Sequence, residues 1–108
     1  MARLTLNVTI DRPIGYDHEG TIYPLNYGYV AGVMGGDGEE QDAYVLTAGD
    51  QPLETFTGQL IAVVHRADDV ETKWVVTDFG KSYTADDIMT RIAFMEQYFE
   101  STLELVEE

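Results

Sequence analysis

The sequence has 108 residues, of which 44% are hydrophobic and 24% charged, and these values indicate one globular domain spanning residues 1–108. The 20 acidic and 6 basic side chains give a net charge of −14, which disfavours nucleic acids and anionic membrane surfaces as partners and favours divalent cations. The absence of cysteine excludes disulfides, zinc–thiolate sites and thiol nucleophiles.

Alternating apolar and polar residues predict a first strand over residues 4–10. After a loop marked by Pro13, Gly15 and Gly20, the aromatic segment 23–30 predicts a second strand that is entered through Pro24. A glycine-rich loop at 32–38 separates it from a third strand at 42–46, and two further strands are expected at 59–66 and 71–77.

The last part of the chain has a helical pattern. Thr84 and Asp87 resemble a capping box, and an apolar stripe follows at Ile88, Ile92, Met95 and Phe99. We therefore expect an amphipathic helix from residue 85 to about residue 100, followed by an acidic tail at 104–108 that frays. Five short strands and one helix predict a mainly β protein, a small barrel or sandwich with the helix over one open side.

No segment has the length of a membrane span, since the longest apolar run, at 60–64, is far shorter than the roughly 20 residues required. The first residues also lack the apolar core of a signal peptide. These features predict a cytoplasmic location.

Two acidic segments, at 37–42 and 68–73, each lead into a predicted strand. In the second segment Glu71 and Lys73 share one face of the strand, and Trp74 and Val76 share the other. A carboxylate beside an ammonium group can bind a metal and an anion together, and hard oxygen ligands suit Mg²⁺ or Mn²⁺. The alternative interpretation is that these acidic residues only solvate turns.

Four segments in order resemble soluble family I inorganic pyrophosphatases. They are Tyr-Pro-Leu-Asn-Tyr-Gly-Tyr at 23–29, Asp-Gly-Glu-Glu-Gln-Asp at 37–42, the acidic turn at 68–73, and the helical segment at 92–98. The resemblance implies a five-stranded, OB-like barrel and hydrolysis of pyrophosphate, or of a related phosphoanhydride, with Mg²⁺. It also implies a homo-oligomer, and a barrel this small gains buried apolar area by association.

The resemblance also implies roles for individual residues. It places Asp42 as a ligand that bridges two metals, and Glu39 near the attacking water. The implied metal ligands are Asp37, Asp42, Asp68 and Glu71, with Asp69 as an alternative to Asp68. The implied substrate contacts are Arg12, Tyr27, Lys73 and Tyr98.

This sequence departs from the family pattern in its charged residues. Glu39 stands where the family commonly has aspartate, Phe99 stands where it has a lysine, and no lysine precedes Lys73, although Asp11 could replace a glutamate of the family's N-terminal strand. The leading hypothesis is a magnesium-dependent pyrophosphatase. The alternatives are a protein of the same fold that binds metal–phosphate without turnover, and a structural domain.

Overall fold

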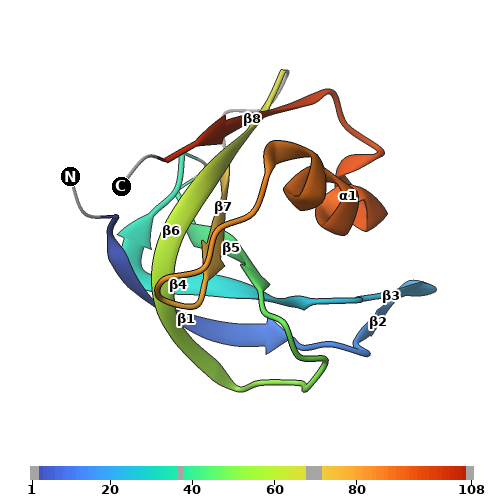
Figure 1. Ribbon diagram of the computed structural model, residues 1–108. Coiled ribbons are helices and arrows are strands. Elements are labelled where there is room, and N and C mark those ends of the chain that lie inside the picture. The colour runs from blue at the N-terminus through green and yellow to red at the C-terminus, as the bar shows by residue number, and fades with distance from the viewer. Residues whose placement is uncertain (1–2, 37, 68–71, 107–108) are drawn as a thin grey trace.

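The computed structural model describes residues 3–36, 38–67 and 72–106. Within these described residues, eight strands and one helix follow one another (Figure 1). They are β1 (Thr5–Arg12), β2 (Asp17–His18), β3 (Thr21–Ile22), β4 (Asn26–Met34), β5 (Glu40–Leu46), β6 (Thr55–Arg66), β7 (Thr72–Thr77), α1 (Ala85–Glu96) and β8 (Ser101–Leu105).

Five of these strands close into a barrel. The main sheet has the order β1-β4-β5-β7-β6-β8, and β1 also pairs with β6. All described pairings are antiparallel except that between β5 and β7, which is parallel. The predicted mainly β fold with a five-stranded, OB-like barrel and a C-terminal helix is confirmed.

The sheet has apolar side chains on both faces, because α1 covers part of its outside. The barrel interior is filled by Leu6, Val8, Ile10, Val30, Ala43, Val45, Leu60 and Val76. The second core lies between the outer face and the helix, and it consists of Leu25, Tyr44, Leu46, Ile61, Ala62, Val64, Val75, Ile88 and Ile92. Alternate residues of β5 therefore contribute to different cores, as the period of two requires.

The helix begins where the sequence predicts, since the Thr84 side chain accepts a 3.1 Å hydrogen bond from the backbone N–H of Asp87. It ends at Glu96, however, and not near residue 100. Phe99 therefore leaves the buried stripe. It is 40% exposed, and its ring lies 3.7 Å from the guanidinium of Arg66.

The expectation of a frayed acidic tail is wrong for the residues through Leu105. Strand β6 pairs with β1 through residues 55–59 and with β8 through residues 62–66. Because β1 covers only the first half of this long strand, its second half leaves backbone groups that β8 pairs.

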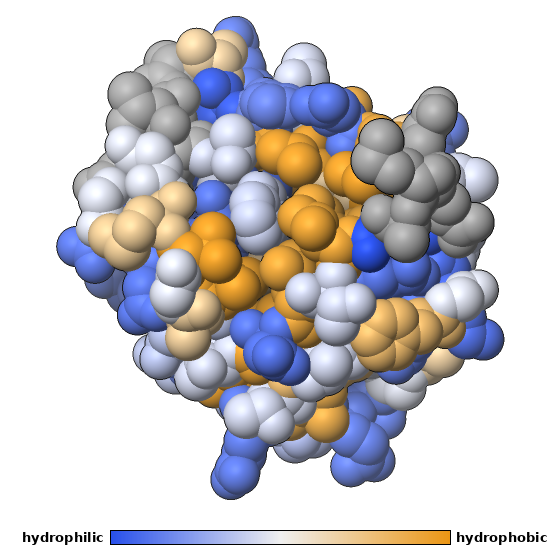
Figure 2. Space-filling model, turned by 90° about the vertical axis from the view of Figure 1, so that its left-hand side faces the viewer, coloured by the Kyte–Doolittle hydropathy of each residue, from blue (hydrophilic) through white to orange (hydrophobic). Residues whose placement is uncertain are grey.

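No helix within residues 3–36, 38–67 and 72–106 has the length and hydropathy to cross a membrane. Figure 2 shows one side of the molecule, where hydrophobic side chains gather in a central area surrounded by polar ones.

Candidate functional site

The candidate site lies on the outer face of the barrel, where β4, β5 and β7 run side by side. Asp42 is opposite Tyr29 of β4, and Ala43 is opposite Trp74 of β7. Trp74 packs against the interior core, so the neighbouring residue, Lys73, points to the outer face with Asp42. The predicted division of β7 between Lys73 on one face and Trp74 on the other is confirmed.

Asp42 and Lys73 form an ion pair at the centre of this region. The Lys73 side chain is only 6% exposed, whereas that of Asp42 is 31% exposed. The neighbouring Gln41 is also buried, and its side-chain amide donates a 2.6 Å hydrogen bond to the backbone carbonyl of Thr72. This bond fastens the start of β5 to the start of β7, and it thereby holds the carboxylate and the ammonium group together.

Tyr27 completes this cluster from β4. The Lys73 ammonium lies 6.0 Å from the centroid of the Tyr27 ring, within the range of a cation–π contact. Burial raises the pKa of the Tyr27 hydroxyl, and the Asp42 carboxylate acts in the same direction, while Lys73 opposes them. Tyr27 therefore remains a neutral hydrogen-bond donor at neutral pH, which suits contact with a phosphate oxygen.

A cavity of about 450 Å³ opens beside Asp42. It is lined by Asp11, Tyr29, Glu39, Glu40 and Asp42. Asp11 enters at an irregularity in β1, because the β1–β4 register shifts between Ile10 and Arg12. Burial raises the pKa of Asp11, and the negative charge of Asp42 adds to this effect, although the backbone and Arg12 oppose it.

The donor chemistry of this cavity suits a hard divalent cation, because four of its five lining residues are carboxylates. Three of the predicted ligands, Asp37, Asp68 and Glu71, lie outside the described residues, as does the alternative Asp69. Within the part of the chain that the structure describes, no three acidic or histidine side chains are grouped so as to hold a metal ion. The described residues thus supply suitable donors around Asp42 without forming a ligand set by themselves.

Arg12 lies beyond Tyr27 on the next strand. Its register partner on β4 is Tyr27, and its guanidinium carbon lies 5.8 Å from the Tyr27 ring centroid. It donates a 2.7 Å hydrogen bond to the hydroxyl of Tyr23. The structure thus brings together four of the residues predicted from the sequence, namely Arg12, Tyr27, Asp42 and Lys73, and Glu39 lines the cavity beside them.

Tyr98 is not brought into this cluster by any described contact. It lies after the end of α1, it is 71% exposed, and its side chain has no hydrogen bond with a described residue. Its predicted contact with phosphate stays a prediction.

The solved structures that resemble this chain include inorganic pyrophosphatases. The inorganic pyrophosphatase from Ehrlichia chaffeensis matches with a TM-score of 0.70 at 17% identity, and the match covers 94% of this chain and 86% of that one. The inorganic pyrophosphatase from Neisseria gonorrhoeae matches with a TM-score of 0.64 at 20% identity, and the match covers 87% of this chain and 73% of that one. The inorganic pyrophosphatase from Helicobacter pylori matches with a TM-score of 0.64 at 16% identity, and the match covers 98% of this chain and 86% of that one. The chain has the fold of an inorganic pyrophosphatase. No family model and no curated protein sequence matches it, so the relationship is shown at the level of the fold.

Within this pyrophosphatase fold, a buried network joins the end of α1 to the barrel beside the site. The Glu96 carboxylate accepts hydrogen bonds of 3.0 and 2.6 Å from Arg66, 2.5 Å from the Tyr44 hydroxyl and 2.7 Å from the Ser101 hydroxyl. The Tyr44 ring in turn packs 5.1 Å from that of Tyr27. Sequence reasoning missed this network, and the only signal available was an acidic residue at position 96 on the buried side of the predicted helix.

The asparagine of the aromatic segment has a structural role. Asn26 is fully buried, and its side-chain carbonyl accepts hydrogen bonds from the backbone N–H groups of Ile14 and Leu53. Its amide donates to the carbonyl of Gln51. These bonds fix the segment that follows Arg12, so Asn26 contributes to the site by holding a loop.

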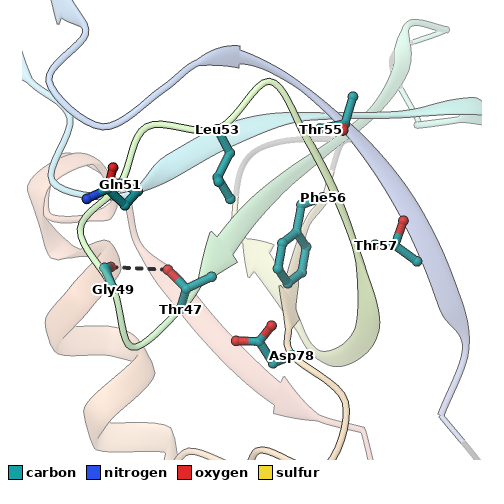
Figure 3. Close-up of a pocket in the computed structure, with 8 residues that line it drawn as sticks. All are labelled: Thr47, Gly49, Gln51, Leu53, Thr55, Phe56, Thr57 and Asp78. Atoms are coloured by element: carbon teal, nitrogen blue, oxygen red, sulfur yellow. Dashed lines mark hydrogen bonds between the residues drawn. The ribbon is translucent and has the colours of Figure 1, made fainter.

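A second cavity, of about 370 Å³, differs in chemistry. Figure 3 shows its lining residues, which are Thr47, Gly49, Gln51, Leu53, Thr55, Phe56, Thr57 and Asp78. Leu53 and Phe56 make it partly apolar, and Asp78 is its one charged residue. Its described lining offers one carboxylate for a metal ion, against four in the cavity beside Asp42, so the cavity beside Asp42 is the better candidate.

Proposed function

We propose that this protein hydrolyses pyrophosphate, or a closely related phosphoanhydride, with Mg²⁺ or Mn²⁺ held by Asp42 and the predicted ligands Asp37, Asp68 and Glu71. The single observation that carries the proposal is the grouping of Asp42, Lys73 and Tyr27 beside a cavity lined by carboxylates. The pyrophosphatase fold supports it.

When bound, divalent metal supplies a more acidic water and neutralises phosphate charge. The protein's side chains would position the metal, accept a proton and stabilise the leaving phosphate. Asp42 would hold the metal through its carboxylate oxygens, and Glu39, which lines the cavity beside Asp42, would accept a proton from the attacking water. Hydrolysis forms one P–O bond from water and breaks the bridging P–O bond. Lys73 and Arg12 offset negative charge that develops on the leaving phosphate, and Tyr27 donates to it.

The main competing function is binding of a metal–phosphate ligand without turnover. It is favoured by the Asp42 oxygen that is already paired with Lys73 and by the low number of basic residues in a chain of net charge −14. A third possibility, a purely structural domain, predicts no binding of metal or phosphate at all.

Two measurements on the pure protein separate these functions. Phosphate release from pyrophosphate at several Mg²⁺ concentrations tests hydrolysis, and titration calorimetry with Mg²⁺ and pyrophosphate tests binding. The proposal predicts both binding and release, with high Mg²⁺ required because the site has few cations of its own. Binding without release would favour the ligand-binding function, and the absence of both would favour the structural domain.

A further inference from the structure

A row of cationic and aromatic side chains extends beyond the cluster of Asp42, Lys73 and Tyr27. The Lys73 ammonium lies 6.0 Å from the Tyr27 ring, and the Arg12 guanidinium lies 5.8 Å from that same ring. Arg12 also lies 6.0 Å from the ring of Tyr16. The residues thus form a continuous strip in which each member is about 6 Å from the next.

Arg12 is suited to bind an anion in this strip. One of its N–H groups donates to Tyr23, and no carboxylate of a described residue forms an ion pair with it. A guanidinium has five N–H donors in a planar fork that fits phosphate oxygens. Donors other than the one that bonds Tyr23 are therefore available to a phosphate group.

The strip ends in two aromatic rings beside the short β2–β3 hairpin, which projects from the end of the barrel (Figure 1). The rings of Tyr16 and His18 are nearly parallel, with an angle of 20° and centroids 6.4 Å apart. Both side chains are accessible, since Tyr16 is 38% exposed and the His18 side chain is 39% exposed.

Neighbouring contacts hold these rings in place. Tyr16 packs edge to face against the buried Tyr23, with centroids 5.8 Å apart, and its carbonyl accepts a 2.9 Å hydrogen bond from the Tyr23 N–H. The Asp17 carboxylate accepts a 2.9 Å bond from the N–H of Gly20 within the hairpin turn. The Tyr16 ring and the hairpin backbone are therefore organised before any ligand arrives, which lowers the entropic cost of binding.

We propose that the Tyr16–His18 pair binds the planar base of a nucleoside diphosphate or triphosphate whose phosphates lie along Arg12 and Lys73. The proposal rests on the proposed function and names the substrate class of the same site. Pyrophosphate has only two phosphate groups, so it can occupy the stretch between Lys73 and Arg12 without touching the hairpin. A base joined to such phosphates through a ribose would reach the two exposed rings, because Tyr16 lies next to Arg12, and aromatic side chains stack on any base.

The test compares two ligands with the same non-hydrolysable phosphate portion. Calorimetry in the presence of Mg²⁺ measures the affinity of methylenediphosphonate and of adenosine 5′-(α,β-methylene)diphosphate. We expect the nucleotide to bind more tightly by about 5- to 160-fold, the range for stacking of one base. Tyr16→Ala should remove most of this advantage and leave the affinity for methylenediphosphonate unchanged.

Two further variants keep the test decisive. Ile22→Ala changes an exposed residue of the same hairpin, directly opposite Asp17, and it should preserve the nucleotide's advantage. His18→Ala alters the second ring without touching the packing of Tyr16 on Tyr23, so it should reduce the advantage even if Tyr16→Ala disturbs the fold.

The outcomes separate this inference from the proposed function. Equal affinity for the two ligands, or an advantage that survives both Tyr16→Ala and His18→Ala, would overturn the base site, whether or not the protein hydrolyses pyrophosphate. A nucleotide advantage that depends on these rings would support the base site even in a protein that releases no phosphate.

Discussion

Replacing Glu96 by glutamine tests the buried network that fastens α1 to the barrel. Glu96 is 2% exposed and accepts hydrogen bonds from Arg66, Tyr44 and Ser101. Glutamine keeps the size of the side chain, but it removes the charge and places an NH₂ group opposite donors. Removing one member of a buried ion pair costs about 3–5 kcal/mol. We expect about 3 kcal/mol, since the glutamine carbonyl can still accept from one donor.

This free energy converts into a measurable shift. With an unfolding entropy of about 2.1 cal/mol/K per residue, the chain of 108 residues unfolds with about 0.23 kcal/mol/K. Glu96→Gln should therefore lower Tm by about 13 °C at pH 7, measured by circular dichroism or calorimetry. The matched control is Glu104→Gln, because the Glu104 carboxylate is 68% exposed and lies 2.8 Å from His65. An exposed pair contributes about 0–1 kcal/mol, so this change should lower Tm by at most about 4 °C.

The pH dependence of the difference gives a stricter test. Burial alone would raise the pKa of Glu96, but hydrogen bonds from Arg66, Tyr44 and Ser101 outweigh it, and the pKa lies below its ordinary value of 4.5. A carboxyl group whose pKa is lowered by folding stabilises the folded state fully above its unfolded pKa, and it loses that contribution as the pH falls through its folded pKa. The Tm difference between wild type and Glu96→Gln should thus be largest near pH 6–7 and shrink below about pH 4.5. A difference that stays constant from pH 7 to pH 3, or one as small as that of Glu104→Gln, would refute the reasoning.

Three further predictions concern the metal, the barrel and the end of the helix. Mg²⁺ at a hundredfold excess over its Kd should add about 2.7 kcal/mol of stability, a rise of about 12 °C in Tm, and Asp42→Asn should remove most of that rise; an equal rise in the variant would contradict the proposed ligand. Gly28→Ala should cost several kcal/mol in thermal melting, because the new Cβ would lie 1.8 Å from a backbone oxygen of β1, whereas Gly49→Ala meets nothing within 4 Å and should change stability by less than about 1 kcal/mol. Phe99→Lys should lower Tm, because it places an ammonium group beside the Arg66 guanidinium, which lies 3.7 Å from the Phe99 ring in the wild type. The same variant should lower KM for pyrophosphate if position 99 reaches phosphate. An unchanged KM in the folded variant would exclude position 99 from the site.

The local features of the fold could be predicted because each of them depends on a short stretch of sequence. Alternation gave the first strand, and the Thr84 cap marked the start of the helix, since both depend on neighbours within a few residues. The end of the helix could not be found in this way. Glu96 is held by Arg66 and Tyr44, which lie 30 and 52 residues away along the chain, and β8 forms only because β6 offers an unpaired edge.

The candidate site shows the same limit. Sequence reasoning could place Lys73 on one face of its strand, but the partnership of Lys73 with Asp42 depends on the parallel pairing of β5 with β7. Asp11 reaches the cavity because of a register shift in β1 that no pattern in the sequence marks. The roles of Asp37, Asp68, Glu71 and Tyr98, the metal and the homo-oligomer stay predictions.

The measurement that tests the central claim most directly is kcat for phosphate release from pyrophosphate by wild type and Asp42→Asn at saturating Mg²⁺. The account predicts turnover by the wild type and a loss of roughly 10³-fold or more in the variant, because the role proposed for Asp42 is to hold the metal that activates the water. Asp50→Asn is the matched control, since Asp50 is an exposed carboxylate in the loop after β5, and it should leave kcat unchanged. Circular dichroism should show both variants folded. Phosphate release that survives Asp42→Asn at the wild-type rate, or a wild type that binds Mg²⁺ and pyrophosphate and releases no phosphate, would contradict the account.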